Sequence, residues 1–393
     1  MLFPAPSAGE MRKEKNGTVY RQKTGGFGMM RLPLLDSSDA ASIDIAQTKR
    51  MVDAFLENGF TYFDTAWMYC GFKSEDAVKE VLTSRHPRES FTLTTKLHAG
   101  FLSEKEDRDR IFDTQRKKTG VSFFDYYLLH DIGADHYKVF TELDCFRWLM
   151  AKKDHGLVRH IGFSFHDSPE LLDRILTEHP EMEFVQLQLN YLDWENPVIQ
   201  SRRCYEVAEK HGIPVIVMEP VKGGTLAKVP QEVENAFRSL HPELSPASWA
   251  IRFAASQPNV KLVLSGMSDL MQLEDNMSYM KKFQPLNAEE TALVHQAAKI
   301  INSGIAIPCT GCSYCTEGCP QNIAIPKYFS LYNANVQEGL DKGWTAQMNY
   351  YDRLIQQFGK AGDCIGCGQC EGICPQHLPI IDNLKKVAAH FEK

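Results

Sequence analysis

Short apolar runs alternate with longer amphipathic segments between about residues 25 and 265. In residues 45–59, for example, apolar side chains recur at helical spacing and Gly59 marks the end of the helix. GGFGMM (25–30) and seven further runs have the length and composition of buried strands. The seven are FTYFDTA (60–66), FTLTTKL (91–97), FDYYLLH (124–130), VRHIGFS (158–164), FVQLQLN (184–190), IPVIVMEP (213–220) and VKLVLSG (260–266). Strands that alternate with helices pair in parallel through right-handed crossovers, so the pattern predicts an α/β fold.

Eight strand–helix units are the number that closes a TIM (β/α)8 barrel. The alternative, an open doubly wound sheet, lacks the G-x-G-x-x-G turn that would follow its first strand. Two more helices are expected after the eighth strand, at about 270–281 and 287–302. The barrel domain is therefore predicted to span residues 20–303.

Outside the barrel the pattern predicts two further segments. Residues 1–19 are expected to form a disordered N-terminal segment, and Met11 is as good a candidate for the true start as Met1. A second domain is expected over residues 304–393, with a helix around 345–358.

Composition limits the classes of function. An apolar content of 43% and a charged content of 24% are ordinary for a soluble globular protein. A formal charge of −7 and a pI near 6.0 give no basic field for nucleic acid or for an anionic membrane. No apolar stretch approaches the roughly 20 residues of a membrane span, and the N-terminus lacks the apolar core of a secretory signal. We therefore expect a cytoplasmic protein without a nucleic-acid or membrane partner.

The second domain contains eight of the 11 cysteines, in two copies of the spacing C-x2-C-x2-C-x3-C-P. The copies are Cys309, Cys312, Cys315 and Cys319, then Cys364, Cys367, Cys370 and Cys374. This is the bacterial ferredoxin run that binds 4Fe–4S clusters, in which the fourth cysteine ligates the other cluster. On that rule Cys319 joins the three cysteines of the second run, and Cys374 joins the three of the first. The prediction is an α+β ferredoxin-like domain with two clusters.

Zinc and disulfides account less well for these cysteines. Zinc uses C-x2-C pairs in closed tetrahedral sites, but a third cysteine two residues on and a fourth before proline do not fit that pattern. Disulfides would require a secreted chain, usually a small one. The remaining cysteines, Cys70, Cys145 and Cys204, are most simply small apolar packing residues.

Four polar residues lie at or just after the C-terminal ends of predicted strands, where TIM-barrel chemistry occurs. They are Asp64, Tyr69, Lys96 and His130. This set suits the reduction of a carbonyl. The pKa of a free tyrosine is near 10, and a neighbouring ammonium that a carboxylate holds in place would lower it toward easy proton transfer. A histidine can orient and polarise the carbonyl oxygen.

With these residues the chain resembles the aldo/keto reductase superfamily over about residues 20–300. The resemblance rests on FDTAWMY, TKL, YLLH, IGFSFHDS, VQLQLNYLDWE, MEPVKGGTL and SGMSDLMQLEDN, which occur in the family's order. More narrowly, it is to the bacterial branch that carries a C-terminal two-cluster ferredoxin domain. It implies that Asp64, Tyr69, Lys96 and His130 form the catalytic tetrad, with Tyr69 as the general acid.

The resemblance also implies a nicotinamide cofactor, NADP(H) or NAD(H). The residues implied to bind it are Gly28, Met29, Ser164, Gln186, Met218, Pro220, Gly224, Gly266, Met267, Gln272, Asp275 and Asn276. Three departures from the family pattern stand out. Phe165 follows Ser164 where many members have asparagine, and Met218 takes the place of a stacking aromatic residue. No Arg or Lys lies between 262 and 280 to pair with a 2′-phosphate, which leaves NADP against NAD open.

Three functions are compatible with these features. In the first, which we favour because the tetrad is complete, the barrel reduces an aldehyde or ketone with NAD(P)H. The clusters are then structural or linked to an external carrier such as a ferredoxin or flavodoxin. In the second, the clusters deliver electrons to a substrate in the barrel, with or without a flavin. In the third, the protein is an electron-transfer or redox-sensing partner that uses the barrel as a binding module.

Overall fold

Residues 12–13, 19–20, 25–303, 306–309, 311, 313–339, 343–374 and 377–392 are described by the computed structural model. The predicted disorder of residues 1–19 falls almost entirely outside these ranges. Within them, β1 (Arg12–Lys13) and β2 (Val19–Tyr20) pair as a small antiparallel sheet.

Eight parallel strands form a closed barrel, in the order β10-β3-β4-β5-β6-β7-β8-β9. Their bounds are β3 (Gly25–Gly28), β4 (Tyr62–Asp64), β5 (Thr92–His98), β6 (Phe124–Ile132), β7 (Val158–Phe165), β8 (Phe184–Gln188), β9 (Val215–Met218) and β10 (Val260–Gly266). Each lies within or beside one of the eight apolar runs. The predicted TIM barrel is confirmed, and the open doubly wound sheet is excluded.

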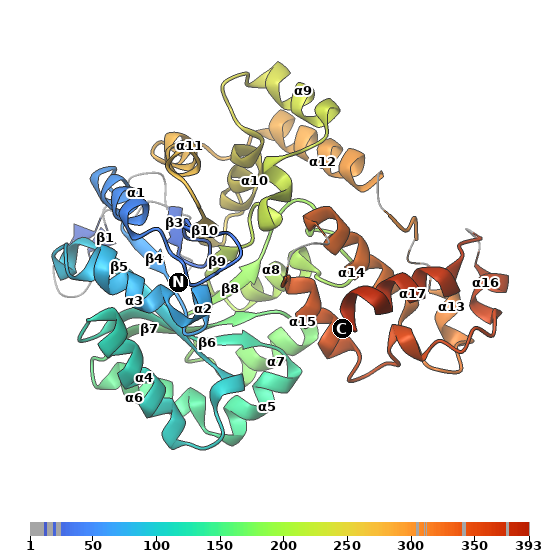
Figure 1. Ribbon diagram of the computed structural model, residues 1–393, viewed down its shortest axis with the longest axis horizontal. Helices are drawn as coiled ribbons and strands as arrows, with labels where there is room; N and C mark the ends of the chain where they lie inside the picture. The colour runs from blue at the N-terminus through green and yellow to red at the C-terminus, as the bar shows by residue number, and fades with distance from the viewer. Residues whose placement is uncertain are drawn as a thin grey trace.

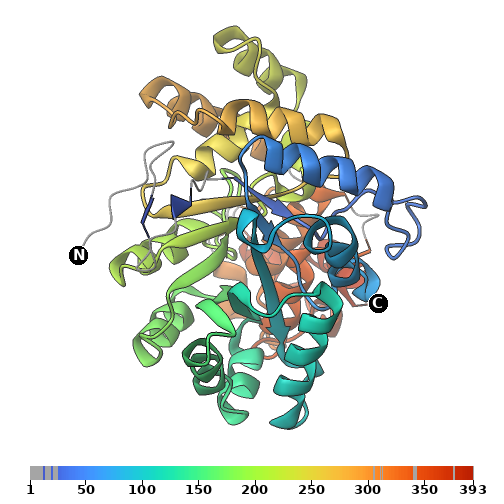
Figure 2. The same ribbon diagram turned by 90° about the vertical axis from the view of Figure 1, so that its left-hand side faces the viewer.

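Helices surround the barrel, as Figures 1 and 2 show. They are α1 (Ile45–Glu57), α2 (Tyr69–Phe72), α3 (Ser74–Val78), α4 (Glu106–Thr119), α5 (Ala134–Glu142), α6 (Cys145–Asp154), α7 (Pro169–Glu178), α8 (Ser201–Lys210), α9 (Gln231–Leu240), α10 (Pro246–Ala255), α11 (Leu270–Met280) and α12 (Ala288–Ser303). Local signals fix several starts. Ser168 and Ser245 accept hydrogen bonds from N–H groups of the first turn, each directly before a proline at the first helical position.

The interior of the barrel is apolar below the C-terminal ends of its strands. Tyr62, Tyr126, Leu128, Phe184, Ile216, Leu262 and Leu264 pack together there. Gly26 on β3 leaves room for this core, because a Cβ at that position would lie 2.7 Å from Leu264 Cδ2. Since side chains along a strand alternate between its two faces, the next inward positions lie one level higher, at the C-terminal ends of the strands.

The second domain consists of α13 (Tyr314–Glu317), α14 (Ile325–Glu338), α15 (Ala346–Leu354), α16 (Gln369–Ile373) and α17 (Ile380–Phe391). Among its described residues, the β content expected from an α+β class is reduced to one bridge between Ile323 and Gly359. Its core includes Val198 and Ile199, which come from the loop after β8 of the barrel. The two domains therefore share buried residues.

α14 and α15 lie on the barrel side of the second domain, whereas α13 and α16 lie at its far end (Figure 1). In Figure 2, which faces the barrel, the C-terminal helices lie behind the strands. None of the helices in the described part of the chain combines the length and apolarity needed to cross a bilayer.

Candidate active site and cluster site

Asp64, Lys96 and His130 lie one level above the apolar interior of the barrel. Asp64 ends β4, two residues after the inward-facing Tyr62, and His130 follows Leu128 on β6 by the same interval. Lys96 lies on β5 between these two strands, and His98, two residues further on, pairs in register with His130. The alternation of side chains therefore brings three of the four predicted catalytic residues to the same mouth.

A buried ion pair joins two of them. Lys96 Nζ lies 2.5 Å from Asp64 Oδ1 and also donates to the carbonyl oxygen of Thr65 at 2.8 Å. The Lys96 side chain is 0% exposed and that of Asp64 is 4% exposed. Burial raises the pKa of Asp64 and lowers that of Lys96, while their mutual attraction opposes both shifts.

Tyr69 begins α2, directly before a bend in which Cys70, Gly71 and Phe72 all have positive φ. Lys96 Nζ lies 4.9 Å from the centroid of the Tyr69 ring. Burial, followed by the charges of Asp64, Glu219 and Asp131, raises the pKa of Tyr69 well above 10.0. The lowering expected from the sequence is wrong, because burial of the phenol and the surrounding carboxylates disfavour the phenolate. Tyr69 is thus held as a neutral phenol that carries its proton.

His130 lies beside Tyr69, with ring centroids 5.8 Å apart and ring planes at 81°. It is 9% exposed, and its Nδ1 finds no hydrogen-bond partner among the described residues. Burial, followed by the positive charge of Lys96, holds the pKa of His130 well below 6.5. The imidazole is therefore neutral near pH 7.

Ser164 and Gln186, the residues expected to bind the carboxamide of nicotinamide, are register partners on β7 and β8. Gln186 Nε2 lies 3.4 Å from Asp64 Oδ2, across the barrel on β4. Ser164 Oγ accepts from the N–H of Asp131 at 2.7 Å, which leaves the hydroxyl proton to donate. Two buried side chains with complementary polar groups thus stand at the mouth, and they fit an amide-bearing ring.

The other residues implied to bind the cofactor follow β3, β9 and β10. Gly28 ends β3, while Met29 is buried and its N–H donates to Asp64 O. Met218 ends β9, Pro220 is buried in the loop after it, and Gly224 is exposed with φ of 98°. After β10, Gly266 is exposed and Met267 is buried.

The start of α11 differs from an open phosphate site. Asp269 caps this helix and accepts from the N–H of Gln272, whose own side chain bonds Ser268 N and Asp269. Asp275 accepts from Ser245, and Asn276 donates to Ser265. A carboxylate thus already accepts a backbone N–H at the helix end where the sequence predicts the adenosine half of the cofactor.

Sequence reasoning missed Glu75, a buried carboxylate whose hydrogen-bond partners include a residue that also bonds the backbone of Lys96. Glu75 is 0% exposed and accepts from Thr95 and Gln115, and Gln115 also donates to the carbonyl oxygen of Lys96 at 2.9 Å. Burial raises the pKa of Glu75. The only local signal is an acidic residue on a helix, a position at which charged residues are usually exposed.

His98, Asp131 and His136 bring three metal-ligating atoms within 4.8 Å of one another, but their hydrogen bonds do not suit a metal. A ligating histidine normally donates its second N–H outward, whereas His98 Nδ1 accepts from the N–H of Gly100 at 3.0 Å. The guanidinium of Arg353 also lies 3.0 Å from Asp131 Oδ1. These residues therefore form a hydrogen-bonded charge cluster beside His130.

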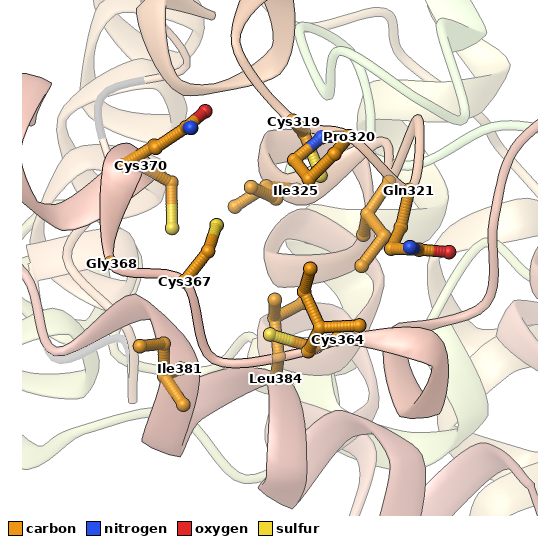
Figure 3. Close-up of a pocket in the computed structure, with 13 residues that line it drawn as sticks. Cys319, Pro320, Gln321, Ile325, Cys364, Cys367, Gly368, Cys370, Ile381 and Leu384 are labelled. Carbon is orange, nitrogen blue, oxygen red and sulfur yellow. The ribbon is translucent and has the colours of Figure 1, made fainter.

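Four cysteines of the second domain line one hollow (Figure 3). They are Cys319, Cys364, Cys367 and Cys370, the set expected to share one cluster. Ile323, Ile325, Ile381 and Leu384 supply apolar walls. Four sulfur ligands on short loops around an apolar hollow fit a 4Fe–4S cubane.

The second expected set is described only in part. Cys315 and Cys374 are buried in the same core, and Cys309 packs against it. Cys312 lies outside the described residues. The three that are described are close enough in the fold to share a core, as the crossed assignment requires.

Comparisons with known proteins agree with this geometry. The Aldo/keto reductase family pattern matches residues 26–299, and a 4Fe-4S dicluster domain pattern matches residues 308–378. An uncharacterised oxidoreductase of Bacillus subtilis, YqkF, is 23% identical over 299 residues, covering 68% of this chain and 90% of that protein.

Two solved structures share the fold. The holo form of an aldo-keto reductase from Bacillus halodurans has a TM-score of 0.56 at 21% identity, covering 74% of this chain and 96% of the other. An aldo-keto reductase from Klebsiella pneumoniae in complex with NADPH has a TM-score of 0.55 at 16% identity, covering 75% and 95%. The chain therefore belongs to the aldo/keto reductase family of oxidoreductases and carries a 4Fe-4S dicluster domain at its C-terminal end.

Proposed function

We propose that the protein reduces an aldehyde or ketone with NAD(P)H. The observation that carries the proposal is the buried Asp64–Lys96 pair, whose ammonium lies 4.9 Å from the centroid of the Tyr69 ring, with His130 packed against that ring. A nicotinamide cofactor, when bound, supplies the hydride. Ser164 and Gln186 are the residues that would orient its carboxamide.

Tyr69 is the general acid in this proposal. Its high pKa keeps the phenolic proton in place until negative charge develops on the substrate's carbonyl oxygen, which then receives that proton. The phenolate left behind is stabilised by Lys96, whose charge Asp64 holds at the site. Neutral His130 orients the carbonyl oxygen and adds no second charge to the pocket.

We also propose two 4Fe–4S clusters, one held by Cys319, Cys364, Cys367 and Cys370, and one by Cys309, Cys312, Cys315 and Cys374. A cluster passes one electron at a time, whereas hydride transfer moves two. α13 and α16, which carry Cys315 and Cys370, lie at the end of the domain away from the barrel (Figure 1). This separation supports a structural role or exchange with an external carrier rather than direct delivery to Tyr69.

The surface near the second motif favours exchange as a further role. Cys367 is exposed, and the neighbouring Ile365 is 63% exposed. A small carrier such as a ferredoxin or flavodoxin is the partner that we propose for this face, and the cytoplasm is the compartment that keeps these thiols reduced.

Tyr69→Phe tests the proposed reaction. The protein is purified anaerobically and its NADH and NADPH oxidation is measured with a panel of aldehydes and ketones. Loss of the acid should reduce kcat by about 10²- to 10⁴-fold while leaving cofactor binding and iron content unchanged. The matched control is Tyr191→Phe, because the buried Tyr191 hydroxyl finds no hydrogen-bond partner among the described residues. Full activity of Tyr69→Phe, or no turnover by the unmodified protein on any carbonyl, contradicts the proposal.

A further inference from the structure

Arg353, in the last turn of α15, is a buried arginine of the dicluster domain, and its side chain reaches the mouth of the barrel. Its side chain is only 7% exposed. Nη1 donates to the carbonyl oxygen of His166 at 2.6 Å, and Nη2 donates to the carbonyl oxygen of Asp131 at 3.0 Å. Nη2 also lies 3.0 Å from Asp131 Oδ1, and Nε lies 3.2 Å from Asp135 Oδ1. One guanidinium thus ties together the end of β6, the start of α5 and the residue after β7.

Two neighbours on α15 strengthen this contact. Asn349, one turn before Arg353, donates to Asp131 Oδ2 at 3.0 Å. The ring of Tyr350 lies 5.9 Å from that of His166 at an angle of 79°. Both carboxylate oxygens of Asp131 therefore have a hydrogen-bond donor on α15.

Asp131 directly follows His130 and has a strained backbone. Its φ is 58°, in the left-handed region that non-glycine residues rarely adopt. Such a conformation persists only where surrounding contacts over-determine it. Here the contacts are Ser164 Oγ, which accepts from the Asp131 N–H, and the bonds from Arg353 and Asn349. Loss of Arg353 would let the residue next to His130 relax.

The charges around His130 come from several elements. Lys96 and His98 lie on β5, Asp131 on β6, His166 after β7, and Asp135 and His136 on α5. Although burial opposes it, His98, whose Nε2 lies 3.8 Å from Asp131 Oδ2, and the charge of Arg353 hold the pKa of Asp131 far below its usual range. Arg353 is the fixed cation that compensates this carboxylate.

The opposite face of α15 belongs to the core of the dicluster domain. Tyr351 is buried there in one core with Cys370 and Cys374. The Tyr351 hydroxyl accepts from the N–H of Ala361 at 3.0 Å, three residues before Cys364, and donates to Glu392. The position of Arg353 therefore depends on the fold around the cysteines.

We propose that Arg353 is a positioning residue of the reductase site. It holds Asp131 at the end of β6 and compensates the negative charge next to His130, so that the site is complete only when the dicluster domain is folded and docked. The inference rests on the proposed function. It assigns to the iron–sulfur domain a part in the barrel's chemistry that requires no electron transfer between the two.

The test is the pH profile of kcat in the full-length, iron-loaded protein. In Arg353→Met the Asp131 carboxylate loses its cation, so the protonated form of His130 is favoured and its pKa rises. Because the neutral imidazole is the active form, the acid limb of the profile should move upward by about one pH unit, the lower end of the range for a charge a few ångströms away. On the acid limb, where a shift of one pH unit changes the neutral fraction of His130 about tenfold, we expect kcat to fall about tenfold, with little change in NADPH affinity.

Three variants separate positioning from general damage. Arg353→Lys keeps the charge and should restore most of the acid limb. Arg353→Met with Asp131→Asn removes the uncompensated carboxylate and should return the limb to its original pH. Lys385→Met, in the same domain but 71% exposed, should match the unmodified protein. A profile of Arg353→Met that superimposes on the unmodified one, with unchanged kcat, overturns the inference.

A second readout does not depend on turnover. In protein labelled at histidine Cε1, NMR titration follows the rings directly, and the His130 signal should titrate at higher pH in Arg353→Met. If no carbonyl is reduced but this shift occurs, the proposed function fails and the inference stands. If turnover occurs but neither His130 nor the rate profile shifts, the inference fails and the proposed function stands.

Discussion

Asp64 and Lys96 are opposite charges at almost fully buried positions, so each depends on the other for its ionised state. Removing one partner of such a pair typically costs about 3–5 kcal/mol, because the remaining charge is left in a low-dielectric site. Lys96→Met should therefore lower the free energy of unfolding of the barrel by about 3 kcal/mol and abolish carbonyl reduction. Denaturant titration followed by tryptophan fluorescence measures the first effect.

The double variant Asp64→Asn with Lys96→Met separates stability from chemistry. Without either charge, the unfolding free energy should recover by at least about half of the loss, whereas activity should stay absent. A single variant as stable as the unmodified protein would mean that Asp64 is protonated in the folded state. Recovered activity in the double variant would remove Lys96 from the mechanism.

The preference between the two nicotinamide cofactors is expected to depend on Asp269. Its carboxylate caps α11 at the end where the family resemblance puts the adenosine half, so it would face a 2′-phosphate with like charge. Asp269→Asn keeps a good capping residue and removes the charge. We expect the Kd for NADPH to fall about fivefold relative to that for NADH, equivalent to about 1 kcal/mol. Paired fluorescence titrations with both cofactors measure the ratio. An unchanged ratio would mean that the 2′-phosphate of NADPH does not bind near Asp269.

Sequence was most informative where a local rule decides a residue's position. The ends of apolar runs located Asp64, Lys96 and His130, since strand alternation and parallel pairing bring such ends to one mouth. The direction of the pKa shift of Tyr69 could not be predicted this way, because it depends on how deeply the phenol is buried and on carboxylates from distant parts of the chain. The contact between Arg353 and Asp131 spans 222 residues and has no local signature.

At the scale of whole elements, Gly133 leaves the space that the Arg353 side chain of α15 occupies at the barrel. A Cβ at Gly133 would lie 2.0 Å from Arg353 Nε. The backbone there, with φ of −136° and ψ of −174°, is extended and suits any residue, so an alanine would be excluded by this contact alone. The strands of the barrel were predictable from their apolar runs. The docking site of α15 was not, because the sequence around Gly133 looks like that of an ordinary turn glycine.

Gly133→Ala should therefore undock α15 without unfolding the barrel. Hydrogen–deuterium exchange should rise in the peptides that contain residues 131–137 and 346–354, and carbonyl reduction should fall as it does in Arg353→Met. Gly343→Ala, three residues before α15, is the control, since a Cβ there meets no atom within 4 Å. Unchanged exchange in Gly133→Ala would show that Arg353 can move aside at little cost.

For the molecule as a whole, the buried contacts between the domains suggest that the clusters act through structure. The core around the cysteines includes Val198 and Ile199 of the barrel, and Lys222 of the loop after β9 is buried between Asp193 and Glu338 of α14. Loss of the clusters would loosen α14 and α15, which contact the loops after β6, β7, β8 and β9. The iron–sulfur domain thus has a route to influence turnover even if its electrons never enter the barrel.

The final prediction distinguishes this structural coupling from electron delivery. Anaerobic protein whose clusters have been reduced with dithionite, then freed of excess reductant, should reduce no carbonyl until NADPH or NADH is added. Once the cofactor is present, the rate should be the same with oxidised and reduced clusters, because the hydride step needs two electrons together and a proton from Tyr69. Chelation of the iron should instead lower the rate and raise hydrogen exchange in α15. The reason is that the domain then loses the cluster that joins Cys319, Cys364, Cys367 and Cys370. Stoichiometric carbonyl reduction by the reduced clusters alone would overturn this view and make the barrel an acceptor of their electrons.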